Sequence, residues 1–340
     1  MVLLIGVVAI GPRPDTGTLT GALPMVNQNL VGLEADINRR EANNPLVKPD
    51  NEARIVWADS TQKVKTPYSM VYLHGFGASQ GEGEPVHRML AERYGCNLYL
   101  SRLVEQGIES DSAFKNMTAE NLLASAREAV AIGKALGERV IIIGTSTGGA
   151  LGLAIAAENP DLAGLILYSP IIAPYDEQLY VLNQPWGTQV MAQVVGGDHI
   201  ITERTGRTKQ YWSRYYHING YVALAVLVDE LMTEDTFEKV RCPVFLAYYY
   251  KSEEEQDQVV SVPAMLTMYE QLGTPAEQKR KQAYAEAGNH VIASYIRSAD
   301  WQGVYQGTDA FLQEVMHLTP EQPVDVAAYA SRYPAEPETE

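Results

Sequence analysis

A short apolar run that leads into a serine between glycines constrains this chain more than any other feature. Residues 140–143 are one Val and three Ile, which is typical of a strand buried on both faces of a parallel sheet. The sequence GTSTGG of residues 144–149 follows at once, and residues 150–158 have the composition of a helix. Because a strand, a tight turn and a helix in this order raise a hydroxyl above the sheet, we expect Ser146 to be a nucleophile.

The glycines of this turn support the same interpretation. A Cβ atom at Gly144 or Gly148, on either side of Ser146, would clash across so tight a turn. The alternative is a glycine-rich turn that only packs a helix on a strand, and the strand and the helix that flank the serine argue against it.

The rest of the chain alternates between expected strands and expected helices. Apolar, β-branched runs bounded by turn residues predict strands at residues 53–58, 69–74, 97–100, 164–169, 244–250 and 281–285. Helical spacing of apolar residues predicts helices at residues 85–94, 118–136, 220–232 and 309–317, the second of them capped by Thr118. This alternation predicts the α/β class, with a mostly parallel sheet flanked by helices.

One connection is too long for a simple crossover between strands. About 70 residues separate the strand that ends near Ile172 from the one that begins near Pro243. We therefore expect residues 173–241 to form a helical cap inserted into a core of residues 51–172 and 242–318. Residues 1–50 are expected to form an N-terminal apolar segment and arm. Residues 319–340 are expected to form an acidic C-terminal tail whose end is disordered.

The apolar segment at residues 2–10 has three interpretations. It is too short to cross a bilayer, which takes about 20 residues, and it lacks the basic start of a signal peptide. It can be the remnant of an anchor, a short signal-like segment or a buried strand. Both a cytoplasmic and a cell-envelope location stay open, and any membrane association is expected only through this segment.

Charge and cysteine content exclude some classes of partner and site. The chain has 26 Lys and Arg against 42 Asp and Glu, a net charge of −16. So acidic a chain without a basic run repels phosphate backbones, which excludes nucleic acid as an expected partner. Cys96 and Cys242 form no C-x-x-C pair, so we expect neither a thiolate zinc site nor a disulfide framework. No other metal site is expected. Both cysteines are expected to be buried, although a single bridge between them remains open.

A serine hydroxyl needs a general base in contact with it near neutral pH. The candidates are His74, His87, His199, His217, His290 and His317. The acid and then the histidine follow the serine along the chain in hydrolases with this kind of turn, and His290 lies in a loop after the last expected strand. The other five precede the serine or fall in the expected cap or closing helix. We therefore expect His290 to be the base.

The acid that orients the histidine is expected in the loop after residues 244–250. Asp257 is followed, after one Gln, by the apolar pair Val259 and Val260, which can anchor this loop. Its rivals are Glu253, Glu254 and Glu255, a run that ordinarily forms a solvated turn. We expect Asp257 to be the acid.

Ester cleavage also needs backbone donors that face the oxyanion of a tetrahedral intermediate. The sequence HGFGAS of residues 74–79 follows another buried strand, at a position where its amides can face the serine. The backbone N–H groups of Phe76 and Thr147 are the expected donors.

These four segments, HGFGAS, GTSTGG, DQVVS and GNHV, together resemble the α/β-hydrolase superfamily. The chain is similar to the carboxylesterases, monoacylglycerol lipases and lysophospholipases with a helical cap, over about residues 54–311. The resemblance implies the α/β-hydrolase fold, a triad and oxyanion hole formed by the residues named above, and no cofactor. Many relatives carry G-H-G after the strand that ends near Leu103, whereas this chain has Glu105, Gln106 and Gly107.

The expected function is that of a serine hydrolase, carboxylesterase-like or lipase-like, which cleaves carboxylic esters through an acyl-enzyme intermediate. The expected partner is a small-molecule ester, with an acyl lipid among the candidates. The alternatives are an acyltransferase or perhydrolase with the same triad, and a non-catalytic binding protein on a hydrolase scaffold. The acyl chain length, the alcohol and the oligomeric state stay open.

An aromatic cluster in the expected cap is the candidate acyl-binding surface. Its residues are Tyr211, Trp212, Tyr215 and Tyr216. They are expected either to contact the acyl chain of a substrate or to form the aromatic core of the cap.

Overall fold

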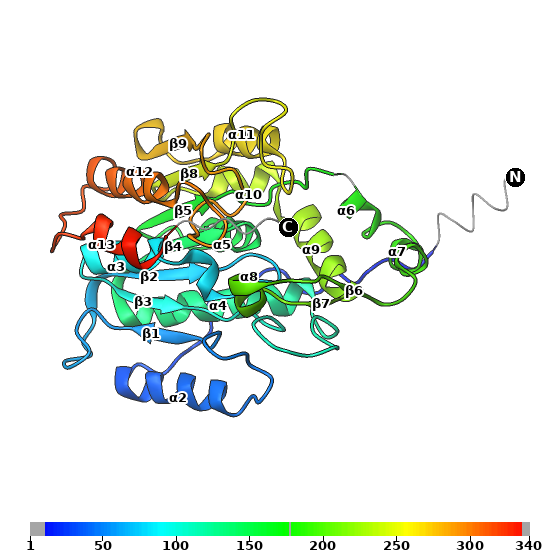
Figure 1. Cartoon of the computed structure of the whole chain (residues 1–340), viewed down its shortest axis with the longest axis horizontal. Helices are drawn as coiled ribbons and strands as arrows, with labels where there is room; N and C mark the ends of the chain where they lie inside the picture. Colours follow the sequence, from blue (N-terminus) through cyan, green and yellow to red (C-terminus); the bar gives the residue numbers. More distant parts are fainter. Residues whose placement is uncertain (1–10, 177, 335–340) are drawn as a thin grey trace, which may run out of the picture.

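A seven-stranded sheet forms the centre of the molecule (Figure 1). The computed structural model describes residues 11–176 and 178–334. The strand order is β1-β3-β2-β4-β5-β8-β9, and every neighbouring pair is parallel except β1 and β3. The strands are β1 (Arg54–Val56), β2 (Thr66–Leu73), β3 (Asn97–Leu100), β4 (Gly137–Thr145), β5 (Gly164–Tyr168), β8 (Val244–Tyr248) and β9 (Lys279–Ala283). The expected α/β architecture with a mostly parallel sheet is confirmed.

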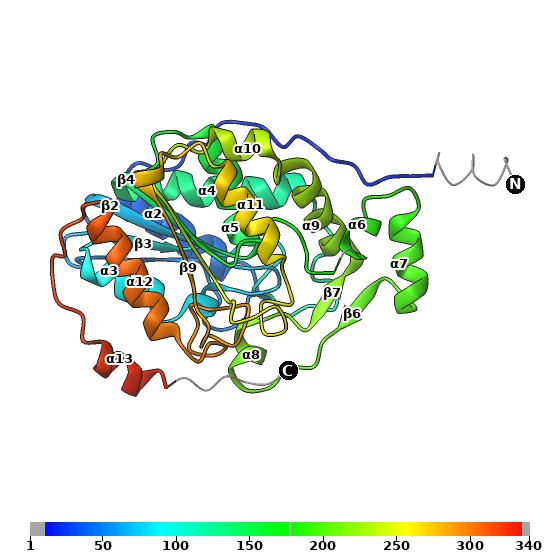
Figure 2. The same cartoon turned by 90° about the horizontal axis from the view of Figure 1, so that it is seen from above.

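Helices cover both faces of this sheet (Figure 2). One face carries α3 (Val86–Arg93) and α12 (Trp301–Glu314). The other carries α4 (Ala119–Leu136), α5 (Thr147–Glu158), α10 (Glu234–Lys239) and α11 (Val262–Gln271). Short 3-10 helices occur at η1 (Gln80–Gly83) and η2 (Ala276–Gln278).

The apolar run that opened the sequence lies in the middle of these layers. Val140 and Ile142 of β4 pack in the core on the α4 and α5 side, and Ile141 and Ile143 pack in the core on the α3 and α12 side. All four are at most 2% exposed. Because residues 140–143 of β4 are buried on both faces, none of these four positions is polar, which explains why this run does not alternate.

Strand register brings the loops that carry chemistry to one edge of the sheet. Leu73 at the end of β2 pairs with Gly144, and Thr145 at the end of β4 pairs with Tyr168 at the end of β5. The carboxyl ends of β2, β4 and β5 therefore lie together, and the turns that follow them meet above the sheet.

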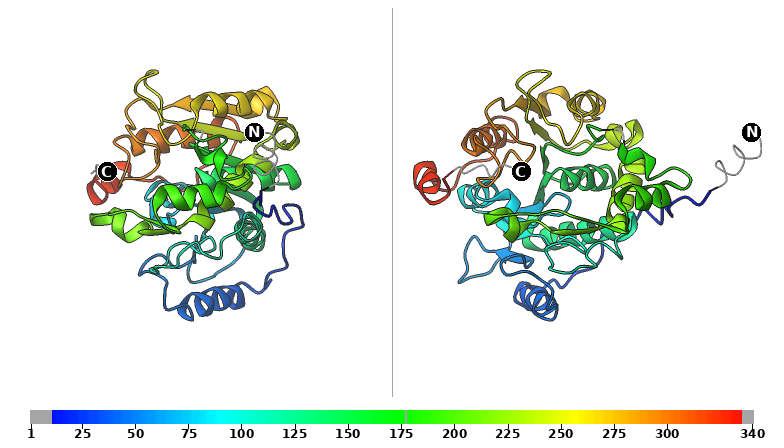
Figure 3. Two further views of the ribbon diagram at one scale, coloured as in Figure 1. Left: turned by 90° about the vertical axis from the view of Figure 1, so that its right-hand side faces the viewer. Right: turned by 45° about the vertical axis from the view of Figure 1, so that its right-hand side comes forward.

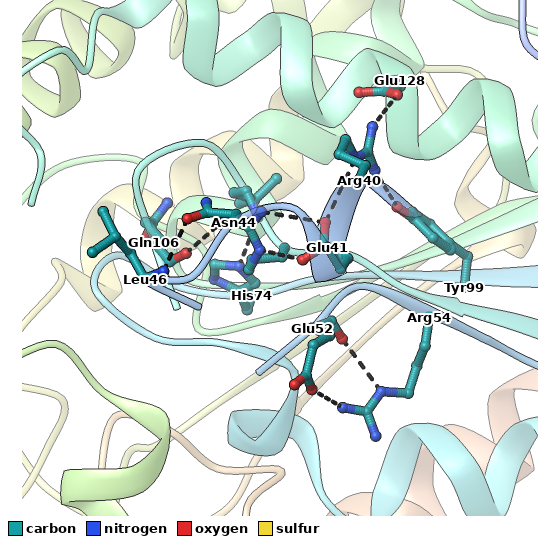
Figure 4. Close-up of polar contacts among 12 residues, drawn as sticks. Arg40, Glu41, Asn44, Leu46, Glu52, Arg54, His74, Tyr99, Gln106 and Glu128 are labelled. Carbon is teal, nitrogen blue, oxygen red and sulfur yellow. Dashed lines mark hydrogen bonds and ion pairs between the residues drawn. The ribbon is translucent and has the colours of Figure 1, made fainter. Parts of the chain in front are cut away.

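The N-terminal part of the chain wraps the core. Leu19 accepts a hydrogen bond from Arg127 of α4 at 2.8 Å, and Figure 2 shows this segment running over the helical layer. It continues into α2 (Leu30–Ala42), where Arg40 pairs with Glu128 and contacts Tyr99 (Figure 4). The expected arm is thus a layer of the fold held by polar contacts.

The expected cap segment lies between β5 and β8 and folds beside the loop edge of the sheet (Figure 3). It contains α6 (Gln178–Val181), α7 (Gly187–Val195), α8 (Gly206–Tyr211) and α9 (Ile218–Leu231), besides α10. It also contains β6 (His199–Ile201) and β7 (Tyr215–His217), an antiparallel pair that the sequence did not indicate.

One expectation about the C-terminal region is corrected. The closing helix was expected at residues 309–317, but α12 begins at Trp301, capped by Asp300, and ends at Glu314, so His317 lies beyond it. Gly303 and Gly307 in the first turns weaken the helical pattern there.

The acidic tail contains α13 (Val326–Arg332), and the rings of Tyr329 and Tyr333 stack there at 6.1 Å between ring centroids. The apolar run at residues 2–10 and the end of the tail lie outside the described residues.

The two cysteines agree with the expectation of burial. Cys96 and Cys242 are both buried and free, so no bridge joins them. Within residues 11–176 and 178–334, none of the helices combines the length and the apolar character that crossing a membrane requires.

Thr118 caps α4 through a reciprocal pair of hydrogen bonds with Asn121, at 3.1 and 2.9 Å. We expect Thr118→Ala to lower the free energy of unfolding by about 1 kcal/mol, because an amide of the first turn loses its acceptor. Thr118→Ser keeps the hydroxyl and should unfold at the same urea concentration as the wild type. Equal stability of the two variants would show that the cap contributes nothing.

Candidate functional site

Ser146 occupies the turn between β4 and α5 in a strained backbone conformation. Its φ is 52° and its ψ is −114°, a combination that a residue with a side chain rarely adopts. Its N–H donates to the carbonyl oxygen of Tyr168 at 3.0 Å, and its own carbonyl accepts from Ile171 at 3.1 Å. These bonds hold the turn against β5 and fix the direction of the hydroxyl.

The glycines beside Ser146 are required by close backbone contacts. A Cβ on Gly148 would lie 1.9 Å from the carbonyl oxygen of Leu73, at the end of β2. A Cβ on Gly144 would lie 2.5 Å from the carbonyl oxygen of Gly148. Helix α5 can therefore begin against the end of β2 only because these positions have no side chain.

His290 and Asp257 are brought together from different loops. Nδ1 of His290 lies 2.6 Å from Oδ2 of Asp257. The other carboxylate oxygen of Asp257 accepts from the amides of Val259 and Val260, at 2.9 and 3.1 Å. Asp257 is 1% exposed, so its orientation is fixed from both sides.

The three rival glutamates do not reach His290. Glu253 accepts from the hydroxyl of Tyr250, Glu254 from the hydroxyl of Ser252, and Glu255 pairs with Lys251. All three are in a solvated turn, as the runner-up interpretation of this run supposed.

The electrostatic setting of His290 favours its charged form. Burial alone would lower its pKa, but the Asp257 carboxylate and, more weakly, Glu82 raise the pKa of His290 above its ordinary value. Its Nε2 is buried and has no hydrogen bond within the described part of the chain. Since the Asp257 contact takes Nδ1–H, the neutral ring presents Nε2 as an acceptor, which is the state a general base requires.

Two residues that line the same cavity as Ser146 have backbone N–H groups without an acceptor in the described part of the chain. Among residues 11–176 and 178–334, the N–H groups of Phe76 and Thr147 donate to no acceptor. Phe76, Thr147, Ser146 and His290 all line one cavity. An oxyanion that forms beside Ser146 would find two free donors there.

The loop that carries Phe76 is held by buried polar side chains. Gln106 accepts from the amide of Gly77 at 2.6 Å. His74 contacts the carbonyl of Gly75 through Nδ1 at 2.9 Å and accepts from the amide of Leu103 through Nε2 at 3.1 Å (His74 and Gln106 are shown in Figure 4). Burial lowers the pKa of His74 to about 4, so this ring is neutral and structural.

The cavity above Ser146 has a volume of about 670 Å³ and a mixed lining. Its apolar wall comes mainly from the expected cap and its borders: Ile171, Pro174, Leu179, Trp212, Tyr221 and Leu224. Its charged lining includes Arg204, Arg297 and Glu82. Sequence reasoning missed Glu82 and Gln106, because an acidic GEGE segment and a lone Gln both resemble surface positions.

Of the four aromatic residues expected to bind the substrate, only Trp212 lines this cavity. Tyr211 points into a separate surface pocket and donates to Asp50. Tyr215 lies in β7 beside Arg214, and Tyr216 is buried in the core, 3% exposed. In a β-strand successive side chains point to opposite faces, so Tyr215 and Tyr216 of β7 could not share one surface.

Tyr216 belongs to an aromatic cluster under the loop that carries Phe76. The ring of Phe114 stacks on Tyr216 at 5.0 Å, and the ring of Phe76 lies 5.8 Å from Tyr216. For Tyr216 the aromatic-core interpretation therefore holds. In residues 11–176 and 178–334, no group of three His, Cys, Asp or Glu side chains is arranged to hold a metal ion.

Comparison with solved structures finds the same fold in several lipolytic enzymes. A metagenome-derived lipolytic enzyme is 17% identical, with 78% of this chain and 99% of that chain covered and a TM-score of 0.62. A monoacylglycerol lipase from Paleococcus ferrophilus is 15% identical, with a TM-score of 0.55. The match covers 79% of this chain and 100% of that chain. Est1E from Butyrivibrio proteoclasticus, solved with ferulic acid, is 18% identical, with a TM-score of 0.53. The match covers 78% of this chain and 95% of that chain.

These likenesses establish the fold of the chain, which is that of the α/β-hydrolases. No protein-family model matches the sequence. A search of curated proteins finds no match either. The fold is therefore recognised through its backbone and not through overall sequence identity.

Gly148 and Gly152 of α5 offer a matched test of the close contact at the turn. A Cβ on Gly152 would meet only side-chain carbons, the nearest being Leu165 Cδ1 at 3.0 Å. We expect Gly148→Ala to lower the free energy of unfolding by about 3 kcal/mol or more, because a backbone carbonyl cannot move aside. Gly152→Ala should change it by about 1 kcal/mol or less, measured by urea unfolding. Equal effects would refute the importance of the contact.

Proposed function

We propose that this protein is a serine hydrolase that cleaves carboxylic esters through an acyl-enzyme intermediate. The observation that carries the proposal is the 2.6 Å contact between Asp257 and His290, whose free Nε2 lines the same cavity as Ser146. The strained turn at Ser146 and the free amides of Phe76 and Thr147 support it. The lipolytic enzymes that share the fold point to the same reaction class.

In the proposed first step, Ser146 Oγ attacks the ester carbonyl carbon while His290 Nε2 takes the hydroxyl proton. The carbonyl oxygen becomes an oxyanion and accepts hydrogen bonds from the amides of Phe76 and Thr147. Asp257 holds the imidazole in the tautomer with a free Nε2 and stabilises the imidazolium that forms. The raised pKa of His290 agrees with that stabilisation.

In the second step the tetrahedral intermediate collapses and the bond to the alcohol oxygen breaks. His290 returns its proton to the departing alkoxide, so that a neutral alcohol leaves and Ser146 carries the acyl group. Water then attacks the acyl carbon while His290 takes its proton, the bond from the acyl carbon to Ser146 Oγ breaks, His290 returns the proton to Oγ, and the carboxylic acid is released. Transfer to another alcohol or to peroxide would use the same intermediate with a different acceptor.

The cavity suggests how the ester is oriented. We infer that the acyl chain lies against the apolar wall at Leu179, Tyr221 and Leu224, since burial of apolar surface there favours it by about 25 cal/mol per Å². A volume of about 670 Å³ suits a single small ester. Esters of p-nitrophenol with graded acyl chains measure the length that this wall accepts, and added alcohol as acceptor distinguishes hydrolysis from transfer.

Ser146→Ala should lower the turnover of p-nitrophenyl esters by about 10⁴-fold or more and abolish labelling by a fluorophosphonate. Ser169→Ala is a matched control, because Ser169 is buried, also has a positive φ and follows β5 as Ser146 follows β4, but does not line the cavity. It should keep its activity. Undiminished turnover in folded Ser146→Ala would exclude the proposed mechanism.

Asp257→Asn tests the role of the carboxylate as the group that selects the tautomer. The Asn oxygen can still accept from the amides of Val259 and Val260, so its NH₂ group would face Nδ1 of His290 and force the proton to Nε2. We expect kcat to fall by about 10⁴-fold with unchanged folding. Glu253→Gln should leave kcat unchanged. A loss of kcat in Glu253→Gln together with an unchanged kcat in Asp257→Asn would instead identify the glutamate run as the source of the acid.

A further inference from the structure

Glu82 is a buried carboxyl group in the wall of the catalytic cavity, and the mechanism above does not use it. It lies on η1, is 2% exposed, and shares the cavity with Ser146, Phe76 and His290. It forms no ion pair with any residue of the described chain. A carboxylate buried without a cation is costly, so the structure must either neutralise or solvate this group.

The two oxygens of this carboxyl group are in different surroundings. Oε2 accepts from the amide of Gly75 at 2.6 Å and from the hydroxyl of Tyr72 at 3.0 Å. Oε1 has no hydrogen-bond partner in residues 11–176 and 178–334, is not fully sealed from solvent, and belongs to a residue that lines the cavity. Since the lone pairs of Oε2 already accept two donors, a proton on this group belongs on Oε1.

Oε1 lies against the loop that is proposed to bind the oxyanion. A Cβ on Gly75 would be only 2.7 Å from Oε1, so the oxygen occupies the space that a side chain at that position would fill. Gly75 directly precedes Phe76, whose free amide is one of the two proposed oxyanion donors. Glu82 therefore contacts the residue next to the proposed donor, and both Glu82 and Phe76 line the cavity.

We propose that Glu82 acts as a neutral carboxylic acid, and that its Oε1–H donates a hydrogen bond to the carbonyl oxygen of the bound ester as a third oxyanion donor. This inference rests on the proposed ester hydrolysis and deepens it. Burial raises the pKa of Glu82 to about 7, against the lowering effects of the Gly75 and Tyr72 hydrogen bonds and of His290. An oxyanion alongside would oppose ionisation further, because like charges repel.

The surrounding groups are compatible with a proton on Glu82. Tyr72 stays neutral, since burial raises its pKa, and burial lowers the pKa of His87, which packs on the Tyr72 ring, to about 4. The other ionisable groups near η1 are Glu84, which is paired with Arg88, and Tyr211, and those in the cavity wall are Arg204, Tyr221, Tyr249, Glu254, Glu255, Asp257, His290 and Arg297. Of these, His290 is the one that acts on Glu82 electrostatically.

The pH dependence of activity follows from the protonation states of His290 and Glu82. His290 must be neutral to act as base, so activity rises as the pH passes its raised pKa. Glu82 must be protonated to donate, so activity falls as the pH rises through about 7, and the carboxylate then also repels the oxyanion. The wild type should show a narrow bell-shaped profile.

Glu82→Gln separates these effects, because glutamine imitates the neutral acid without titrating. Its oxygen can accept from Gly75 and Tyr72 while its NH₂ group donates to the substrate. We expect kcat/KM of this variant to stay level at alkaline pH, where that of the wild type falls about tenfold per pH unit.

Glu82→Ala removes both acceptor and donor and should lower kcat by about 10²-fold at every pH. Circular dichroism and fluorophosphonate labelling of Ser146 confirm that each variant is folded with an assembled triad. A Glu82→Gln profile that follows the wild type would overturn the inference, and so would a folded, labelled Glu82→Gln with no activity.

Infrared difference spectra of the free protein give a readout that does not depend on turnover. A carboxylic acid carbonyl band should disappear between about pH 6 and pH 8 in the wild type and be absent in Glu82→Gln. If the wild type shows this band but neither hydrolyses esters nor is labelled at Ser146, the proposed function fails and the protonated state of Glu82 stands. If it is active and lacks the band, only the inference about Glu82 fails.

Discussion

The whole reaction centre depends on one backbone contact, the approach of α5 to the carbonyl end of β2. Gly148 lies so close to the carbonyl of Leu73 that any side chain would separate the two. Because β2 and β4 are adjacent and end at the same level, this contact places the serine turn beside the loop of residues 74–79. Ser146, the proposed nucleophile, and Phe76, a proposed oxyanion donor, then line one cavity.

The parts of the site that could be predicted from the sequence are those that local backbone geometry determines. Ser146 was recognisable because a both-faces-buried strand, two glycines and a helix are consecutive in the chain. The order of acid and histidine narrowed the remaining choice to His290 and Asp257, which the structure joins. The α/β class followed from alternating apolar runs, which depend on burial by neighbouring layers.

The parts that could not be predicted depend on contacts between distant segments. Tyr215 and Tyr216 are consecutive, and only the strand β7 decides that one points outward and the other into the core. Glu82 belongs to an acidic segment that resembles a solvated turn, and its burial requires Tyr72 and Gly75 to be in place. In each case the chemistry of the residue is visible in the sequence and its environment is not.

The positive φ of Ser146 has a consequence for how such a protein evolves. Glycine would relieve the strain of the turn, which is of order 1–3 kcal/mol, at the position where it would also remove the nucleophile. Drift under selection for stability alone would therefore erase the reactive serine from this scaffold. A serine in this turn is therefore the expected result if the proposed reaction, and not stability alone, has been selected at this residue.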